Sequence, residues 1–316
     1  MARIISGQHP TMNRQRDKAF FLNWWLLLRP HTLTAAVMPV LIGTSMAVVE
    51  GKFKLLLFAT MLLASVLIQS AVNMFNEYFD FRRGLDTVDS VGIGGSIVRG
   101  EMHERAVLKT ATTFFAISIL LGSYICAATS WWVAVIGSAS MLVGYFYSGG
   151  PSPIAYTPAG EIAAGIFMGP VIVLIAYFVQ AGSVTMRSVL MSVPISILVA
   201  AIMLANNIRD AKRDGAKGRK TIAIRLGQSK AIGLLGLLFT LSFLWTAVMA
   251  ITGLATLWIL ISLACIPKAV QSIKIFRRGG TPLDMMPAMK ATSILHSQFG
   301  ILFSAGLLVG RLLPLV

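Results

Sequence analysis

Nine apolar stretches, each about the length of a membrane-spanning helix, follow one another along the chain. About 20 helical residues cross the hydrocarbon core of a bilayer. Only 12% of the 316 residues are charged, against about 25% in soluble domains, so a water-exposed surface could not be covered with charge. The pattern predicts an all-α integral membrane protein with about nine transmembrane helices. The stretches cover approximately residues 32–50, 54–76, 107–127, 130–148, 160–181, 187–207, 230–250, 253–275 and 292–314.

The sequence ahead of the first stretch is basic and has no short apolar core followed by a small-residue cleavage site. It therefore does not look like a removable signal peptide. Trp24 and Trp25 precede the first span, where amphipathic rings favour the level of the lipid headgroups. We expect two regions: a cytoplasmic and interfacial segment over residues 1–31, and a single transmembrane domain over residues 32–316.

The basic residues predict how the chain is oriented. With the N-terminus inside, 23 of the 27 Lys and Arg fall in inside segments and four fall in outside segments. Positively charged loops stay in the cytoplasm, so the N-terminus and the two longest loops are expected on the cytoplasmic side of the plasma membrane. The net charge of +15 follows mainly from this topology. A nucleic-acid partner is not expected, because the basic residues are divided among short loops.

Acidic residues gather at two equivalent places, the inner ends of the second and sixth spans. Glu77, Asp80 and Asp86 follow the second span, and Asp210 and Asp214 follow the sixth. Four spans separate the two groups, which predicts two related four-helix units and a ninth helix. A site between structural repeats is common in membrane proteins.

Helical spacing brings each group of acids onto one face. Asn73, Asn76, Glu77 and Asp80 are spaced i, i+3, i+4 and i+7, and Asn207, Asp210 and Asp214 are spaced similarly. Such a set without His or Cys favours a hard cation, Mg²⁺ before Zn²⁺. The acids could also simply end the helices. The predicted metal ligands are Asn73, Asn76, Glu77, Asp80, Asp86, Asp210 and Asp214.

Basic residues on the same loops suggest a phosphate-bearing substrate. Mg²⁺ shares its coordination shell readily with phosphate oxygens, and Arg and Lys bind phosphate directly. Acids for the metal and bases for phosphate together predict a diphosphate site. Each base could instead serve only to set topology. The candidates for substrate binding are Arg82, Arg83, Arg99, Arg209 and Arg213.

Three other features are open to two interpretations. The connection over residues 145–161 contains Tyr145, Tyr147, Tyr156 and Glu161; it could be a tight turn, or its rings could hold a flat substrate or face a carbocation. The Gly-rich VGIGGS at 91–96 could be a flexible loop or a lid. His296 could be a packed polar residue or a ligand.

These motifs resemble those of the UbiA-type superfamily of intramembrane aromatic prenyltransferases, which carry an acidic motif after helix 2 and a D-x-x-x-D motif after helix 6. Finer features are similar to the bacterial 1,4-dihydroxy-2-naphthoate polyprenyltransferases of menaquinone synthesis. They include NMFNEYFDFRRGLD, YSGGPSPIAYTPAGE, NNIRDAKRDGAKGRKTIAIRLG and PAMKATSILH. The resemblance runs from about residue 28 to about residue 300. It implies nine helices around a central cavity that opens to lipid and is capped by cytoplasmic loops.

The sequence departs from the family pattern in its first acidic motif. Glu77 stands where the family usually has Asp, and position 84, where many relatives have a third acid, is Gly. Asp86 is the nearest acid that could replace it.

The resemblance also implies a reaction. A polyprenyl diphosphate would ionise with the help of Mg²⁺, and 1,4-dihydroxy-2-naphthoate would accept the chain, giving demethylmenaquinone, pyrophosphate and CO₂. Asp80, Asp210, Asp214 and Lys220 would carry catalysis, with Asn73 and Asn207 beside the substrate. The lipid bilayer would surround the isoprenoid tail.

Other functions stay open. The acceptor could be 4-hydroxybenzoate, a porphyrin or a chlorin. A transporter would place polar groups near the membrane midplane, whereas these helix centres are almost free of charge. A polyprenyl-lipid binding protein would release no pyrophosphate.

The charge bias makes a prediction about orientation. Single cysteines introduced at Val88 or Ala216 in intact cells should resist an impermeant thiol reagent, because both positions are expected in the cytoplasm. A cysteine at Ser183, between the fifth and sixth spans, should react and serves as the control. Labelling at residue 88 or 216 from outside would show that the orientation is inverted.

Overall fold

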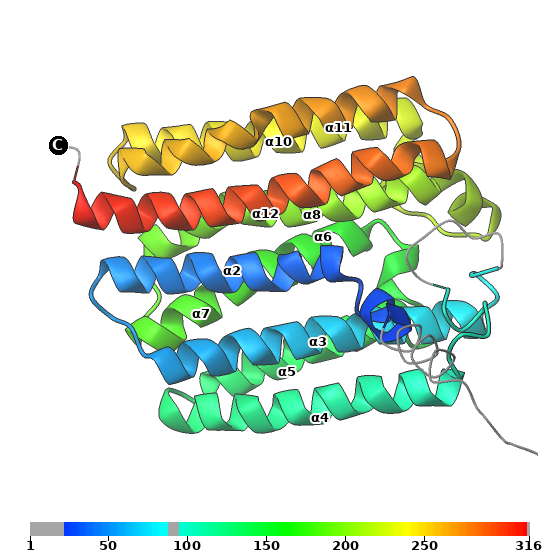
Figure 1. The fold of residues 1–316 in the computed structure, drawn as a ribbon, viewed down its shortest axis with the longest axis horizontal. Helices are drawn as coiled ribbons and strands as arrows, with labels where there is room; N and C mark the ends of the chain where they lie inside the picture. Colours follow the sequence, from blue (N-terminus) through cyan, green and yellow to red (C-terminus); the bar gives the residue numbers. More distant parts are fainter. Residues whose placement is uncertain (1–21, 88–94, 315–316) are drawn as a thin grey trace, which may run out of the picture.

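The computed structural model describes residues 22–87 and 95–314, and they form a bundle of long helices that run side by side (Figure 1). In this part of the chain, eight helical segments are long and apolar enough to cross a membrane, and a shorter apolar helix, Trp132–Ser148, makes a ninth. The prediction of an all-α membrane protein with about nine spans is confirmed. Most of the predicted N-terminal segment 1–31, Asp89, and residues 91–94 of the Gly-rich loop lie outside the described residues.

The nine spans connect in chain order through short turns. The first four are α2 (Pro30–Val49), α3 (Leu55–Arg82), α4 (Glu104–Ala128) and α5 (Trp132–Ser148). After the short turn η1 (Ile154–Tyr156), the fifth is built from α6 (Ala159–Ile166), η2 (Phe167–Val171) and α7 (Ile172–Ala181). The last four are α8 (Met186–Ala216), α10 (Gln228–Ile251), η3 (Leu257–Cys265) continued by α11 (Ile266–Arg278), and α12 (Pro282–Leu312), with the short α9 (Ile222–Leu226) before α10.

Three helices extend beyond the apolar stretches that predicted them. The predicted spans end near residues 76 and 207 and begin near 292, whereas α3 reaches Arg82, α8 reaches Ala216 and α12 begins at Pro282. Both acidic motifs are therefore helical, as their spacing predicts. The 28 residues of α3 span about 42 Å at 1.5 Å per residue, more than the roughly 30 Å of hydrocarbon. Backbone hydrogen bonds continue the helix after the lipid has ended. The acidic motifs therefore lie on rigid helix ends.

The fifth span contains a break. Residues Phe167–Val171 form a π-helical turn that includes Pro170, and proline cannot donate a hydrogen bond to the helix. Gly169 lies so close to α8 that a Cβ atom there would be 2.6 Å from Ser196 Cα. Small residues permit such close helix packing in membranes. The break therefore sits where the fifth span is pressed against α8.

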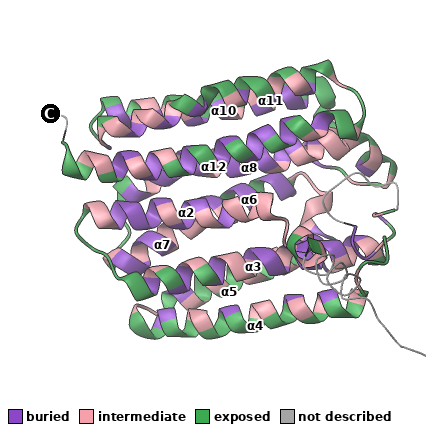
Figure 2. Cartoon of the chain, viewed as in Figure 1, coloured by how far each residue is buried: buried purple, intermediate pink, exposed green. Residues whose placement is uncertain are grey.

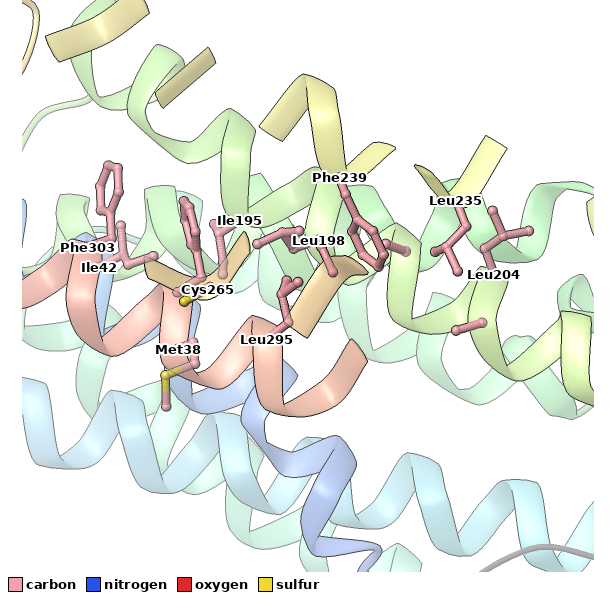
Figure 3. Close-up of a cluster of buried hydrophobic side chains, with 14 of the residues drawn as sticks. Met38, Ile42, Ile195, Leu198, Leu204, Leu235, Phe239, Cys265, Leu295 and Phe303 are labelled. Atoms are coloured by element: carbon pink, nitrogen blue, oxygen red, sulfur yellow. The ribbon is translucent and has the colours of Figure 1, made fainter. Parts of the chain in front are cut away.

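The interior of the bundle contains several clusters of buried apolar side chains, and one of them joins α2, α8, α10 and α12. Side chains of α2, α8, α10 and α12 interdigitate there, among them Ile42, Leu198, Phe239 and Phe303 (Figure 3). Cys126 and Cys265 are buried and unbonded to each other, as expected for small core residues. His296 is also fully buried, and its ring nitrogens have no hydrogen-bond partner among the described residues.

The bundle has two exposed edges. Helices α10 and α11 form one edge, α4 forms the opposite edge, and α2, α8 and α12 lie between them (Figure 1). Exposed residues follow α4 and the α10–α11 edge along their length (Figure 2), and many are large and apolar, such as Leu120 and Leu244. In a membrane these side chains face lipid, which requires no polar covering.

Candidate active site

A cavity of about 330 Å³ runs through one half of the bundle. Its walls come from α2, α3, α4, α5, the fifth span and α8, and they are mostly apolar. Polar side chains line one end, including Arg29, Asn76 and Tyr147, whereas Trp131 and Cys126 line the other. From Tyr147 to Trp131 the wall extends about 24 Å at 1.5 Å per residue. This shape suits a long apolar ligand with a polar head.

Two asparagines of α3 anchor the polar end of the cavity. Asn73 donates to Leu28 O at 2.8 Å and to Thr32 Oγ1 at 2.9 Å. Asn76 donates to Asp80 Oδ2 at 3.2 Å and to Ser148 Oγ at 2.9 Å. The two amides therefore tie the start of α2 and the end of α5 to α3.

Glu77 is 1% exposed, and both its carboxylate oxygens have partners. Gly95 N donates to Oε1 at 2.6 Å, and Ile97 N lies 3.4 Å from the same oxygen. Arg29 Nη2 lies 3.3 Å from Oε2, and Arg29 Nη1 donates to Asn76 Oδ1 at 2.8 Å. Glu77 thus joins α3, the segment before α2 and the loop after residue 94.

The second acidic motif lies on the last turns of α8, where arginines pair with both carboxylates. Arg209 contacts Asp210 at 2.6 Å, and Arg213 contacts Asp210 at 3.8 Å and Asp214 at 3.4 Å. Arg209 also points Nη1 toward the sulfurs of Met286 and Met289 on α12. The motif is therefore neutralised locally and joined to the last helix.

Arg219 connects the two acidic motifs. Its Nη2 lies 3.0 Å from Asp80 Oδ1, and its Nη1 lies 2.9 Å from Asp214 Oδ2. The guanidinium also lies over the ring of Tyr156 at 4.8 Å. The C-terminal ends of α3 and α8 meet here, as the sequence predicted.

The pKa values outside the spans reflect this concentration of charge. Burial, and next the negative charge of Asp80, raise the pKa of Asp86 to about 6. Burial lowers the pKa of Arg219, but attraction to Asp80 and Asp214 outweighs it and the net pKa is raised. Asp86 thus lies within electrostatic reach of the motif on α3.

The donor set is suited to a hard cation. The four aspartates and Asn76 supply only oxygen, which matches Mg²⁺. Among the described residues, however, no three His, Cys, Asp or Glu side chains converge in an arrangement that could hold a metal. Arginines lie between the carboxylates instead. Asp80, Asp210 and Asp214 are each paired with at least one arginine in this structure.

Several predicted substrate-binding residues lie away from the cavity. Arg82 is 3.7 Å from Glu104, and Arg99 is 2.8 Å from Glu101 at the surface. Arg83 donates to the carbonyl oxygens of Ser148 and Gly150 and so holds the α5–α6 connection. Tyr145 packs edge-on against Phe75 in an aromatic cluster between α3, α4 and α5.

The rest of the α5–α6 region stays close to the site. Tyr147 lines the cavity. Tyr156 lies under the guanidinium groups of Arg83 and Arg219. Glu161 is 3% exposed; its Oε1 accepts from Asn207 Nδ2 at 2.8 Å, and its Oε2 has no hydrogen-bond partner among the described residues.

The side chain of the predicted catalytic residue Lys220 does not lie between the two acidic motifs, and Arg29 was not among the predicted site residues. Lys220 is exposed, and its backbone N–H donates to Tyr156 O at 2.7 Å, whereas the Arg219 side chain occupies the centre of the site. Arg29 contacts the first motif from 47 residues away. Its position next to Pro30, just before the first span, is the only sequence signal that could have suggested it.

The position of Arg219 generates a prediction about stability. Replacing it by Gln in the metal-free protein should leave Asp80 buried without a counter-charge and Asp214 with Arg213 alone, at a cost of about 3 kcal/mol. The measurement is thermal unfolding in detergent. Adding Asp214→Asn to Arg219→Gln should recover part of the loss, and Arg225→Gln, which removes an exposed cation, is the control. Equal unfolding temperatures for Arg219→Gln and Arg225→Gln would contradict this account.

Comparison with known proteins agrees with this arrangement. Residues 36–285 match the model of the UbiA prenyltransferase family. The chain is 50% identical over 285 residues to the 1,4-dihydroxy-2-naphthoate octaprenyltransferase of Bacillus subtilis, covering 90% of this chain and 92% of that one. It is 27% identical to the enzyme of the same name from Escherichia coli, covering 85% and 89%.

Solved structures share the fold. A UbiA homologue from Aeropyrum pernix superposes with a TM-score of 0.65 at 18% identity, covering 89% of this chain and 98% of that one. A UbiA homologue from Archaeoglobus fulgidus bound to GPP and Mg²⁺ gives a TM-score of 0.64 at 17% identity, with 89% and 99% covered. With the family match extending over most of the chain, the protein is a member of the UbiA prenyltransferase family.

Proposed function

We propose that the protein transfers a polyprenyl chain from its diphosphate to 1,4-dihydroxy-2-naphthoate. The products are pyrophosphate, CO₂ and the reduced form of demethylmenaquinone. The observation that carries the proposal is the long apolar cavity whose polar end is lined by Asn73 and Asn76 of the first motif and by Asn206, next to the second motif. The acceptor rests on the 50% identity to the Bacillus subtilis octaprenyltransferase.

The apolar part of the cavity and its polar end would bind different parts of the polyprenyl diphosphate. The apolar walls would hold the isoprenoid tail, and Arg29, which lines the cavity, would attract the diphosphate. Arg219 and Arg213 lie on the same side of the bundle and would add positive charge as the leaving group departs. Fixed charges in a site that excludes water stabilise developing negative charge strongly. Exclusion of water also protects the allylic cation formed when the C–O bond breaks.

Asp80, Asp86, Asp210, Asp214 and Asn76 are the residues proposed to hold Mg²⁺. Bound Mg²⁺ would supply positive charge to the diphosphate oxygens. The arginines that now pair with these aspartates would be released to bind phosphate. Asn73 is committed to α2 through two hydrogen bonds, so we assign it an anchoring role.

Glu77 is proposed to position the loop and Arg29. Both of its oxygens are engaged by Arg29 and by backbone amides of the loop. A carboxylate with these partners is not free to bind metal. Glu77 would therefore orient Arg29 toward the cavity.

The acceptor is proposed to lie beside Tyr147, between the first motif and α6. Tyr147 lines the cavity, and its ring could lie against the flat naphthoate. Glu161 accepts from the Nδ2 of Asn207, which turns the oxygen of that amide away from Glu161. The ring carbon that bears the carboxylate would attack the allylic cation, and loss of that carboxylate as CO₂ would restore the aromatic ring. The site is proposed to face the cytoplasm of a bacterial cell.

The proposed metal ligands can be tested by removing one negative charge at a time. Asp80→Asn and Asp210→Asn should lower turnover by about 100- to 1000-fold, because one such electrostatic contact is worth roughly 3–4 kcal/mol in the transition state. Pyrophosphate release by purified protein is the measurement, and excess EDTA should abolish it. Both variants should insert and purify normally. If the variants insert or fold poorly, but the protein that does fold turns over at the wild-type rate, the acids would instead be structural.

The acceptor is tested by product mass spectrometry. Purified protein should be offered one polyprenyl diphosphate together with 1,4-dihydroxy-2-naphthoate, 4-hydroxybenzoate or a chlorin. Only the naphthoate should gain the chain and lose CO₂. Prenylation of 4-hydroxybenzoate alone would overturn the acceptor and leave the reaction type standing, whereas consumption of no donor would favour a binding or transport protein.

A further inference from the structure

A purely cationic surface lies at the inner ends of α9, α10 and α11. Residues 215–283 contain nine Lys and Arg and no Asp or Glu. Three of the nine, Lys217, Arg219 and Lys220, belong to the connection beside the active site. The other six form what we call the cationic edge: Arg225, Lys230, Lys268, Lys274, Arg277 and Arg278.

The cationic edge faces outward. Lys268 is half-buried and the other five residues are exposed. On α11 the buried face consists of Ala269, Ser272 and Phe276. Lys274, Arg277 and Arg278 occupy the opposite half of the helix, and Lys268 lies at the border of the buried face. Helices α10 and α11 form an outer edge of the bundle (Figure 1), and their inner ends are exposed (Figure 2). In the membrane this surface meets the inner leaflet directly.

These charges have no internal partner. Within residues 22–87 and 95–314, none of the six forms an ion pair, and Lys268 donates only to Gln271 at 3.1 Å. The start of α4 has a different setting, because acidic residues lie among its cations: Arg82 of α3 pairs with Glu104, and Arg99 pairs with Glu101. Arg105 and Lys109 of α4 are exposed close to these two glutamates in the sequence. Positive charge on the cationic edge is therefore uncompensated by protein.

The position of Lys268 within a membrane-spanning segment indicates that its side chain interacts with lipid. It lies ten residues before Arg278 on α11, about 15 Å along the helix axis, on a segment long and apolar enough to cross the membrane. A Lys at that depth extends its side chain toward the interface. Lys274, Arg277 and Arg278 lie beyond it, so the ammonium and guanidinium groups approach the level of lipid phosphates. Orientation requires positive charge near the inner surface, but not a charge placed this deep.

We propose that the cationic edge binds the phosphate headgroups of anionic phospholipids in the inner leaflet. Basic clusters at the cytoplasmic ends of transmembrane helices attract anionic lipid. The apolar side chains of α10 and α11 accommodate the acyl chains, and the cations hold the headgroups. Through α9 and the connection at residues 217–221, the bound lipid adjoins the element that carries Arg219. The proposal is independent of the acceptor and of the reaction.

The test is native mass spectrometry of the full chain after equilibration in mixed micelles that contain equal amounts of phosphatidylglycerol and phosphatidylcholine. The wild-type protein should retain phosphatidylglycerol preferentially. The double variant Lys274→Gln and Arg278→Gln should lose about fivefold of that preference for each charge removed near the surface. The matched control is Arg105→Gln and Lys109→Gln at the inner end of α4, which should keep the wild-type preference.

Each other outcome overturns the proposal. If the cationic-edge variant and the wild-type protein prefer phosphatidylglycerol equally, these residues serve only to set the orientation of the chain in the membrane. An equal loss in the α4 control would show a general charge effect. Inorganic phosphate added at constant ionic strength should not displace the lipid; displacement would indicate a site for free phosphate. Cysteine labelling at residue 216 in each variant confirms that orientation is unchanged.

Discussion

The pairing of Arg219 with Asp80 and Asp214 is the interaction on which the inner half of the structure depends. The two aspartates lie on helices separated by more than 100 residues, and both are buried. Buried carboxylates repel each other unless a cation lies between them. Arg219 satisfies both, and its packing against Tyr156 draws in the α5–α6 connection. One side chain therefore brings α3, α8 and the turn after α5 to a common point.

The membrane separates apolar residues from charged residues along the length of the helices. Within the hydrocarbon the backbone must satisfy its own hydrogen bonds, and side chains facing lipid can be apolar. Beyond it, α3, α8 and α12 continue for several turns and carry the charged residues. Rigid helix ends hold functional groups more firmly than loops do. The cavity passes from the apolar zone to the polar zone, which is the geometry that an amphiphilic substrate needs.

Several polar groups at the site hold neighbouring segments of the protein in place. Glu77 engages backbone amides of a loop, Arg83 engages backbone carbonyls, and Asn73 engages the start of α2. Most hydrogen-bonding atoms of these side chains have partners. This favours the folded state, because a buried polar group without a partner destabilises the protein. These residues are of the same types as metal and phosphate ligands. Only their partners show that they organise the site.

The sequence by itself determined the membrane class, the approximate number of spans and the two places where acids gather, because these depend on length, hydropathy and helical spacing. It also determined family membership through its motifs. Only the tertiary structure decided that Arg219 rather than Lys220 lies between the motifs, that Arg29 reaches Asn76, and that Tyr145 packs away from the cavity. Neighbouring residues of the same type look alike in a sequence, and their direction is set by turns and by contacts with helices far along the chain. The helix ends were also decided there, since hydropathy marks where lipid stops and packing marks where a helix stops.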